Sequence, residues 1–118
     1  MPADRMRRVN EALREVLSVR IAGGLKDPRI GFVTVTAVDT SPDLRHARVY
    51  VSVLGDEEER AATMEGLESS RGFLQAGIAR ELRIKHTPAL QFEHDAALER
   101  GMRISRLLDE ADGENRDQ

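Results

Sequence analysis

The sequence contains no cysteine and no tryptophan, and it has few other aromatic residues. Without cysteine, the chain can form neither disulfides nor thiolate metal sites, which is compatible with a reducing compartment. No apolar run approaches the roughly 20 residues that a membrane-spanning helix needs. Residues Met1 to Arg5 carry charge and lack the apolar core of a secretory signal. We therefore expect a cytoplasmic protein that has no membrane association.

Recognisable catalytic and metal-binding motifs are also missing. The three histidines, His46, His86 and His94, include no pair spaced four residues apart, the spacing that places two ligands on one helix face. The sequence has no phosphate-binding glycine loop, no dinucleotide fingerprint and no nucleophile elbow around a serine. We therefore predict no catalytic residue, no metal site and no cofactor, and we interpret the chain as non-enzymatic.

Charge is distributed unevenly along the chain, whose net charge is −3. Residues 56–68 hold six acids and one base, and residues 107–118 hold five acids and one base. Removing these contributions of −5 and −4 leaves +6 on the remaining residues. A basic face on an acidic protein can bind nucleic acid because contacts and fields act locally. An ordinary solvated helix surface explains the same charges equally well.

Apolar periodicity predicts a helix followed by two strands. The helix is predicted over residues 4–22 and ends at Gly23 and Gly24, since glycine is common just past a helix end. Its apolar stripe consists of Met6, Val9, Leu13, Val16 and Leu17. Segments 32–38 and 47–54 alternate apolar and polar residues, and their short connection predicts an antiparallel pair. The residues expected on the inner faces are Val33, Val35, Ala37, Ala47, Val49, Val51 and Val53.

The second half of the chain predicts two helices and a strand. Acidic residues 56–59 suit the first turn of a helix, where negative charge meets the positive end of the helix dipole. Serine and glycine at residues 70–72 predict a kink, after which a further helix reaches about Arg83. Leu90 and Phe92 mark a third strand, and 97–108 predicts a last helical turn or two. We therefore predict one domain over 1–108 and an acidic, disordered tail over 109–118.

The resulting order, α-β-β-α-α-β, is typical of the type II KH arrangement, an α+β fold with a three-stranded sheet. An RNA recognition motif would begin with a strand and carry stacking aromatics, which this chain lacks. Ordinary KH domains clamp a nucleic-acid backbone with a GxxG loop between two helices. The corresponding junction here is Ser70-Arg71-Gly72, which contains no such loop. We therefore expect a helix–kink–helix in its place.

Several stretches of the chain form a specific pattern when taken in order and with their spacing: Lys26–Gly31, Ser41–Leu44, Ala47–Ser52, Gly72–Leu74, Leu82–Arg83 with Pro88, and Gly101–Ile104 with Leu107–Leu108. This pattern resembles that of the ribosome-binding factor A family. The resemblance covers residues 5–108 and includes the helix–kink–helix that replaces the KH loop. Ser70 departs from the pattern, because the family usually has alanine at the kink, and Ala89 and Ala97 are smaller departures.

The resemblance implies a non-catalytic ribosome assembly factor that binds the free small (30S) ribosomal subunit. It implies contact with 16S rRNA and nearby ribosomal proteins, a late role in maturation and 5′-end processing of that RNA, and support of growth in the cold. It also implies a functional link to an assembly GTPase, and we expect a monomer. The alternative that we retain is a small protein–protein interaction module without RNA affinity of its own.

The candidate RNA-binding residues are basic residues on the first predicted helix, in the loop after it, around the predicted kink, and at the end of the third predicted helix. They are Arg5, Arg7, Arg8, Arg14, Lys26, Arg29, Arg71, Arg80, Arg83 and Lys85. Arginine suits phosphate because its planar fork presents two donors at once. Given the resemblance, we favour RNA contact over surface solubility for the cluster Arg7, Arg8, Arg14, Lys26 and Arg29. Arg83 and Lys85 also suit a helix C-terminus for electrostatic reasons alone.

Overall fold

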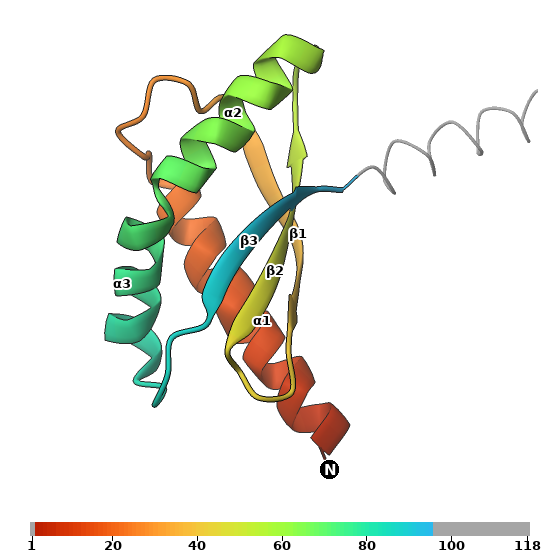
Figure 1. The fold of residues 1–118 in the computed structure, drawn as a ribbon, viewed down its shortest axis with the longest axis vertical. Helices are drawn as coiled ribbons and strands as arrows, with labels where there is room; N and C mark the ends of the chain where they lie inside the picture. Colours follow the sequence, from red (N-terminus) through yellow and green to blue (C-terminus); the bar gives the residue numbers. More distant parts are fainter. Residues whose placement is uncertain (1, 96–118) are drawn as a thin grey trace, which may run out of the picture.

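The computed structural model describes residues 2–95 and confirms the predicted order of helices and strands (Figure 1). The elements are α1 (Pro2–Ala22), β1 (Val33–Thr40), β2 (His46–Val53), α2 (Glu57–Ser69), α3 (Arg71–Leu82) and β3 (Ala89–His94). The predicted helical turns over 97–108 and the predicted acidic tail over 109–118 lie outside the described residues.

The three strands form one sheet with β2 in the middle. β1 pairs with β2 in the predicted antiparallel sense, and β3 pairs with β2 in the parallel sense. The parallel pairing follows from the connection, because α2 and α3 carry the chain back to the end of the sheet where β2 began. In Figure 1, α1 passes behind the sheet, while α2 and α3 lie beside β3. The sheet therefore brings its β1–β2 turn and the start of β3 to the same end of the molecule.

The first strand departs from the simple alternation that the sequence predicts. Val35 and Val38 are buried, whereas Ala37 is exposed. The register shifts between Val35, which lies opposite Val51, and Ala37, which lies opposite Tyr50. This β-bulge adds one residue to β1 and so exchanges its two faces beyond the bulge. The prediction that Ala37 faces inward with Val35 is therefore wrong, while the predicted inner face of β2 is confirmed.

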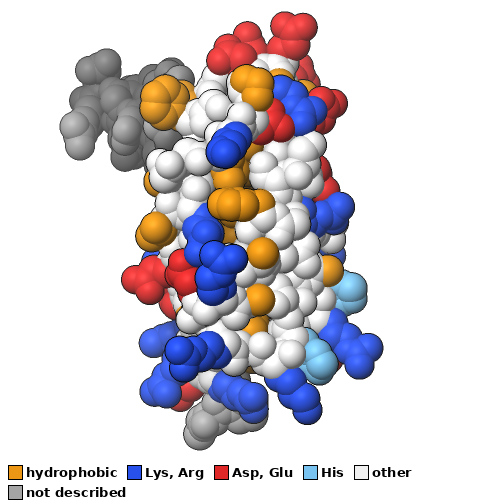
Figure 2. Space-filling view, turned by 90° about the vertical axis from the view of Figure 1, so that its left-hand side faces the viewer, with side chains coloured by type: hydrophobic (Ala, Val, Ile, Leu, Met, Phe, Trp, Pro, Cys, Tyr) orange, Lys and Arg blue, Asp and Glu red, His pale blue; other side chains and the backbone are white. Residues whose placement is uncertain are grey.

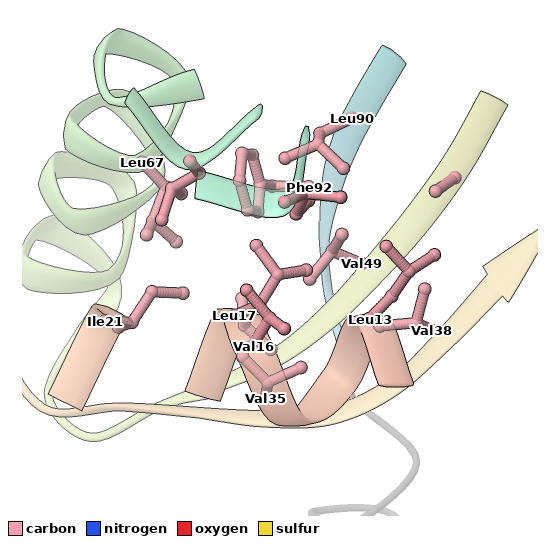
Figure 3. Close-up of a cluster of buried hydrophobic side chains, with 14 of the residues drawn as sticks. Leu13, Val16, Leu17, Ile21, Val35, Val38, Val49, Leu67, Leu90 and Phe92 are labelled. Carbon is pink, nitrogen blue, oxygen red and sulfur yellow. The ribbon is translucent and has the colours of Figure 1, made fainter. Parts of the chain in front are cut away.

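A continuous apolar core joins α1 and both later helices to one face of the sheet (Figure 3). Leu13 and Leu17 of α1 are completely buried and lie against the strand valines. The other labelled members are Val16, Ile21, Val35, Val38, Val49, Leu67, Leu90 and Phe92. Truncation of a buried leucine to alanine typically costs about 2–5 kcal/mol. The core therefore fixes the helices, and with them the surface residues that the next section describes.

Candidate nucleic-acid interface

A single residue, Ser70, separates α2 from α3. Its backbone N–H donates to the carbonyl oxygens of Gly66 and Leu67, both at 3.1 Å, and its hydroxyl donates to the Gly66 oxygen at 2.9 Å. The Ser70 carbonyl accepts the N–H of Leu74 at 3.0 Å, so α3 starts at once. The predicted helix–kink–helix is confirmed. Because no loop projects between the helices, the GxxG type of backbone clamp has no structural counterpart in the described residues.

Arg71, the first residue of α3, is held against the neighbouring strand. Its guanidinium donates to the carbonyl oxygen of Leu90 at 3.3 Å and lies 3.3 Å from the Glu68 carboxylate. Gln75, one turn further along α3, donates to the Pro88 carbonyl at 3.4 Å. These contacts tie α3 to β3. Arg71 is therefore positioned at the kink, but its charge already has a carboxylate partner.

Arg29 holds the loop between α1 and β1 against the end of α2. Its guanidinium contacts both oxygens of Asp27, at 2.6 and 3.0 Å, and donates to the Ser69 hydroxyl at 2.8 Å. The carboxylate of Glu65 lies 3.6 Å away. Two hydrogen bonds from Arg29 lower the pKa of Asp27 from 3.8 to about 2; the side-chain bond has the larger effect and the backbone N–H bond the smaller one. We call this set, Asp27, Arg29, Glu65 and Ser69, the loop latch.

Close packing on α2 reinforces the loop latch. The Thr63 hydroxyl is buried, accepts the N–H of Gly31 at 3.2 Å and donates to the Arg29 carbonyl at 3.3 Å. A side chain at Gly66 would place its Cβ 2.6 Å from Cγ1 of Ile30, so this glycine allows the loop to rest on the helix. The sequence pattern of residues 26–31 therefore encodes a loop anchored to α2.

Arg14 lies on α1 and also has a partner. Its guanidinium is 2.9 Å from the Glu11 carboxylate, one turn earlier on the same helix. Hydrogen bonding and charge from Arg14 lower the pKa of Glu11, and the reciprocal bond raises the pKa of Arg14. Of the candidate RNA-binding residues, Arg14, Arg29 and Arg71 are thus already paired with carboxylates.

The remaining candidates, apart from Lys26, gather at one end of the molecule. The start of α1, the end of α3 and the loop before β3 all lie at the lower end in Figure 1, beside the β1–β2 turn. We call the cations of this region the basic end: Arg5, Arg7, Arg8, Arg45, Arg80, Arg83 and Lys85. All are exposed, and within residues 2–95 none has a carboxylate within ion-pairing distance. Figure 2 shows Lys, Arg and His side chains gathered there.

Arg45 belongs to the basic end but was not among the candidates from the sequence. It follows the turn at Ser41 to Asp43, where the Asp43 carboxylate accepts the Arg45 N–H at 3.1 Å and the Ser41 hydroxyl at 2.6 Å. This turn directs the Arg45 side chain to the exposed surface. A basic residue in the short connection between the first two predicted strands was the available signal, although its proximity to α1 and α3 requires the fold.

The opposite end of the molecule is acidic. Asp56 caps α2 by accepting the N–H of Glu59 at 2.8 Å, and the Glu59 side chain accepts the Asp56 N–H in return. This capping box confirms the predicted helix start and leaves Glu57 and Glu58 exposed in the first turn. Acidic side chains mark the upper end of the face in Figure 2. Within residues 2–95, positive charge is therefore concentrated at one end of the fold and negative charge at the other.

The chemistry available at the basic end is phosphate binding by exposed guanidinium and ammonium groups. Within residues 2–95 no cluster of three or more histidine, aspartate or glutamate side chains is arranged to hold a metal ion. None of the described helices is both long and apolar enough to cross a membrane.

Comparison with known proteins identifies the family of this chain. The family model for ribosome-binding factor A matches residues 5–108. The chain belongs to the ribosome-binding factor A family. Ribosome-binding factor A of Halothermothrix orenii is 48% identical over 108 residues, which cover 92% of this chain and 88% of that protein. The family consists of ribosome assembly factors that are not enzymes.

Solved structures of ribosome-binding factor A share the fold, which is of the type II KH-like kind. The crystal structure of the Thermus thermophilus protein matches with a TM-score of 0.66 and 30% identity, covering 75% of this chain and 94% of that one. A homology model of the same protein, fitted into a cryo-EM map of a complex between the 30S subunit and ribosome-binding factor A, matches with a TM-score of 0.60. It is 33% identical and covers 72% of this chain and 89% of that one.

Proposed function

We propose that this chain binds the free small (30S) ribosomal subunit in the cytoplasm and aids late maturation and 5′-end processing of its 16S rRNA. The family and the complex of a relative with the 30S subunit support the choice of partner. Release by an assembly GTPase and support of growth in the cold belong to the same proposal. In this proposal, the basic end contacts RNA phosphates, and the chain also contacts ribosomal proteins close to that RNA.

The observation that carries this proposal is the convergence, on one end of the fold, of cations from separate segments that have no ion-pair partner among residues 2–95. Arg8 comes from α1, Arg45 from the β1–β2 turn, Arg83 from the end of α3, and Lys85 from the next loop. The seven exposed cations of the basic end outnumber the exposed acids within two residues of them, Asp4, Asp43 and Glu81, so this end carries net positive charge. Binding through such cations releases counterions from the RNA, so the affinity falls steeply as salt rises.

Sedimentation with purified ribosomal particles tests the proposal. We expect the chain to sediment with free small subunits, and not with large subunits or whole ribosomes, and to dissociate as salt increases. Arg83→Gln should weaken the association and flatten its salt dependence. Ala61→Glu lowers the net charge equally but changes an exposed residue of α2 at the acidic end, so it should leave binding intact.

Two other results would overturn the proposal. A folded chain that stays unbound in every fraction would remove direct ribosome binding and favour the protein–protein interaction module. Binding to small subunits that is insensitive to both salt and Arg83→Gln would place the contact on an apolar protein surface instead of RNA phosphates.

A further inference from the structure

A hollow lies beside the kink, where the loop after α1 meets the start of α3. Its lining comes from residues 24–27 on one side and from Ser69, Ser70 and Phe73 on the other. The cavity volume is about 410 Å³. Gly24, whose φ is +95°, contributes no side chain to the wall, and no atom lies within 4 Å of its hypothetical Cβ. The hollow therefore has free space beside Gly24 for an entering group.

An exposed aromatic ring borders this hollow. The Phe73 side chain is 59% exposed, although phenylalanine is normally buried in a domain of this kind. The guanidinium carbon of Arg20 lies 5.9 Å from the centre of the ring, which is cation–π distance. Arg20 is fixed there by an ion pair with Glu81 at 2.7 Å and by Gly77, whose Cβ position would fall 2.6 Å from Cδ of Arg20. The ring is thus held in place while much of it remains available.

Polar groups around the hollow fit a nucleotide. Lys26 is exposed and has no carboxylate within ion-pairing distance among residues 2–95, so its ammonium group is available to a phosphate. The neighbouring carboxylate, Asp27, is paired with Arg29 in the loop latch instead of with Lys26. The Ser69 hydroxyl accepts a hydrogen bond from Arg29, which leaves its own proton free to donate to a base acceptor.

We propose that this hollow binds one unpaired nucleobase of the RNA, stacked on Phe73, with the adjoining phosphate on Lys26. This site deepens the proposed function and rests on it, because it adds a base contact to the phosphate contacts of the basic end. Base stacking on an aromatic side chain tolerates any base, so the site recognises single-stranded RNA by shape and charge instead of by sequence.

A tryptophan probe tests the hollow without the ribosome. Since the chain contains no tryptophan, Phe73→Trp introduces a single indole at the site. Titration with adenosine 5′-monophosphate at millimolar concentrations should quench its fluorescence in a saturable way, and Lys26→Gln should weaken this binding. The matched control is Phe32→Trp, at a residue that is 80% exposed and outside the hollow, where only linear collisional quenching is expected. Equal, linear quenching at both positions would overturn the site.

Binding to small subunits provides the second readout. Phe73→Leu removes the ring and keeps the position apolar, so affinity should fall by about fivefold or more, the range of one stacked base. Phe73→Tyr keeps the ring and should bind as the wild type does. A thermal melt is expected to be similar for both variants, because Phe73 is exposed.

The two proposals fail in different ways. If the wild type does not bind small subunits, the proposed function fails. If the wild type and Phe73→Leu bind them equally, the base site fails while the proposed function stands. Weaker subunit binding by Phe73→Leu without saturable nucleotide quenching would identify a protein side chain as the occupant and overturn the assignment to RNA.

Discussion

The arginines of the basic end and those around the kink lie in opposite surroundings. Arg29 contacts Asp27, Ser69 and Glu65, and Arg71 contacts Glu68 and a strand carbonyl. Within residues 2–95, Arg7 and Arg83 have no ion-pair partner of this kind. The same residue type therefore fastens one segment to another around the kink and remains available to a ligand at the basic end.

The difference has an energetic consequence for phosphate binding. A phosphate that reaches Arg29 must compete with Asp27 for a guanidinium that is already bonded through two nitrogens. Arg83 has no carboxylate partner among residues 2–95, so a phosphate that reaches it has no described carboxylate to displace. Exposed cations with no carboxylate partner are therefore the ones expected to set the salt dependence of RNA binding.

Charge reversal at the basic end should have the largest effect. We expect the double variant Arg7→Glu/Arg83→Glu to bind small subunits at least about 100-fold more weakly, since two attractive contacts become repulsive. The slope of log affinity against log salt should become shallower by about 1.8, for two lost phosphate contacts. Affinity measured at several salt concentrations gives both values. An unchanged slope would show that these cations do not contact phosphates.

Overpacking where Ile30 rests on α2, beside the loop latch, should have the next largest effect, on stability. Gly66→Ala would press a methyl group against Ile30, and such overpacking typically costs about 1–3 kcal/mol. Alanine regains up to about 1 kcal/mol through its higher helix propensity. We expect the free energy of unfolding in urea to fall by about 1–2 kcal/mol.

Gly72→Ala is the matched control for this stability measurement. Gly72 is also helical, but no atom lies within 4 Å of its hypothetical Cβ. Its replacement should leave the free energy of unfolding unchanged or raise it by up to about 1 kcal/mol. A similar loss of stability in both variants would show that the contact between Gly66 and Ile30 does not matter.

Neutralising one arginine in each region sharpens the comparison. Arg83→Gln should reduce the salt slope of small-subunit binding by about 0.9, the contribution of one phosphate contact. Arg29→Gln should leave this slope unchanged, because its charge is already paired with Asp27. Parallel titrations of the two variants measure the difference. An equal loss of slope would assign Arg29 to the RNA-binding surface despite its partners.

The loop latch should also persist in moderate acid. The pKa of Asp27 is about 2 in the folded chain, below its ordinary value of 3.8, so its contribution to stability is fully present above about pH 4. As pH falls through about 2, the carboxylate is protonated and the contribution is lost. NMR titration of the Asp27 carboxyl carbon should give a midpoint near 2. A midpoint at the ordinary value would mean that Arg29 does not hold this carboxylate in solution.

Most of the fold is predictable from sequence because it depends on local periodicity. The valines of β2 alternate as a half-buried strand requires, and serine beside glycine at 70–72 indicates the kink. The bulge in β1 is different. Nothing in the alternation of Val35, Thr36 and Ala37 indicates an extra residue, because the bulge arises from pairing with a partner strand.

The candidate site was only partly predictable for a related physical reason. Sequence identifies which residues carry positive charge, but a cation is available only if no carboxylate lies near it in space. The contact between Arg29 and Glu65 joins residues far apart along the chain, as does the bond between Arg71 and Leu90. The role inferred for Phe73 also depends on a distant residue, Arg20. Such pairings become visible only once the helices are placed on the sheet.

The separation of acidic and basic ends has a consequence for how the chain approaches its target. A net charge of −3 repels a polyanion at long range, yet the field of the RNA also exerts a torque on the separated charges. In the proposed complex with RNA, that torque would turn Arg83 and its neighbours toward the RNA, and Glu57 and Glu58 away from it, before any contact forms. The acidic start of α2 would therefore reduce the share of encounters that begin in an unproductive orientation.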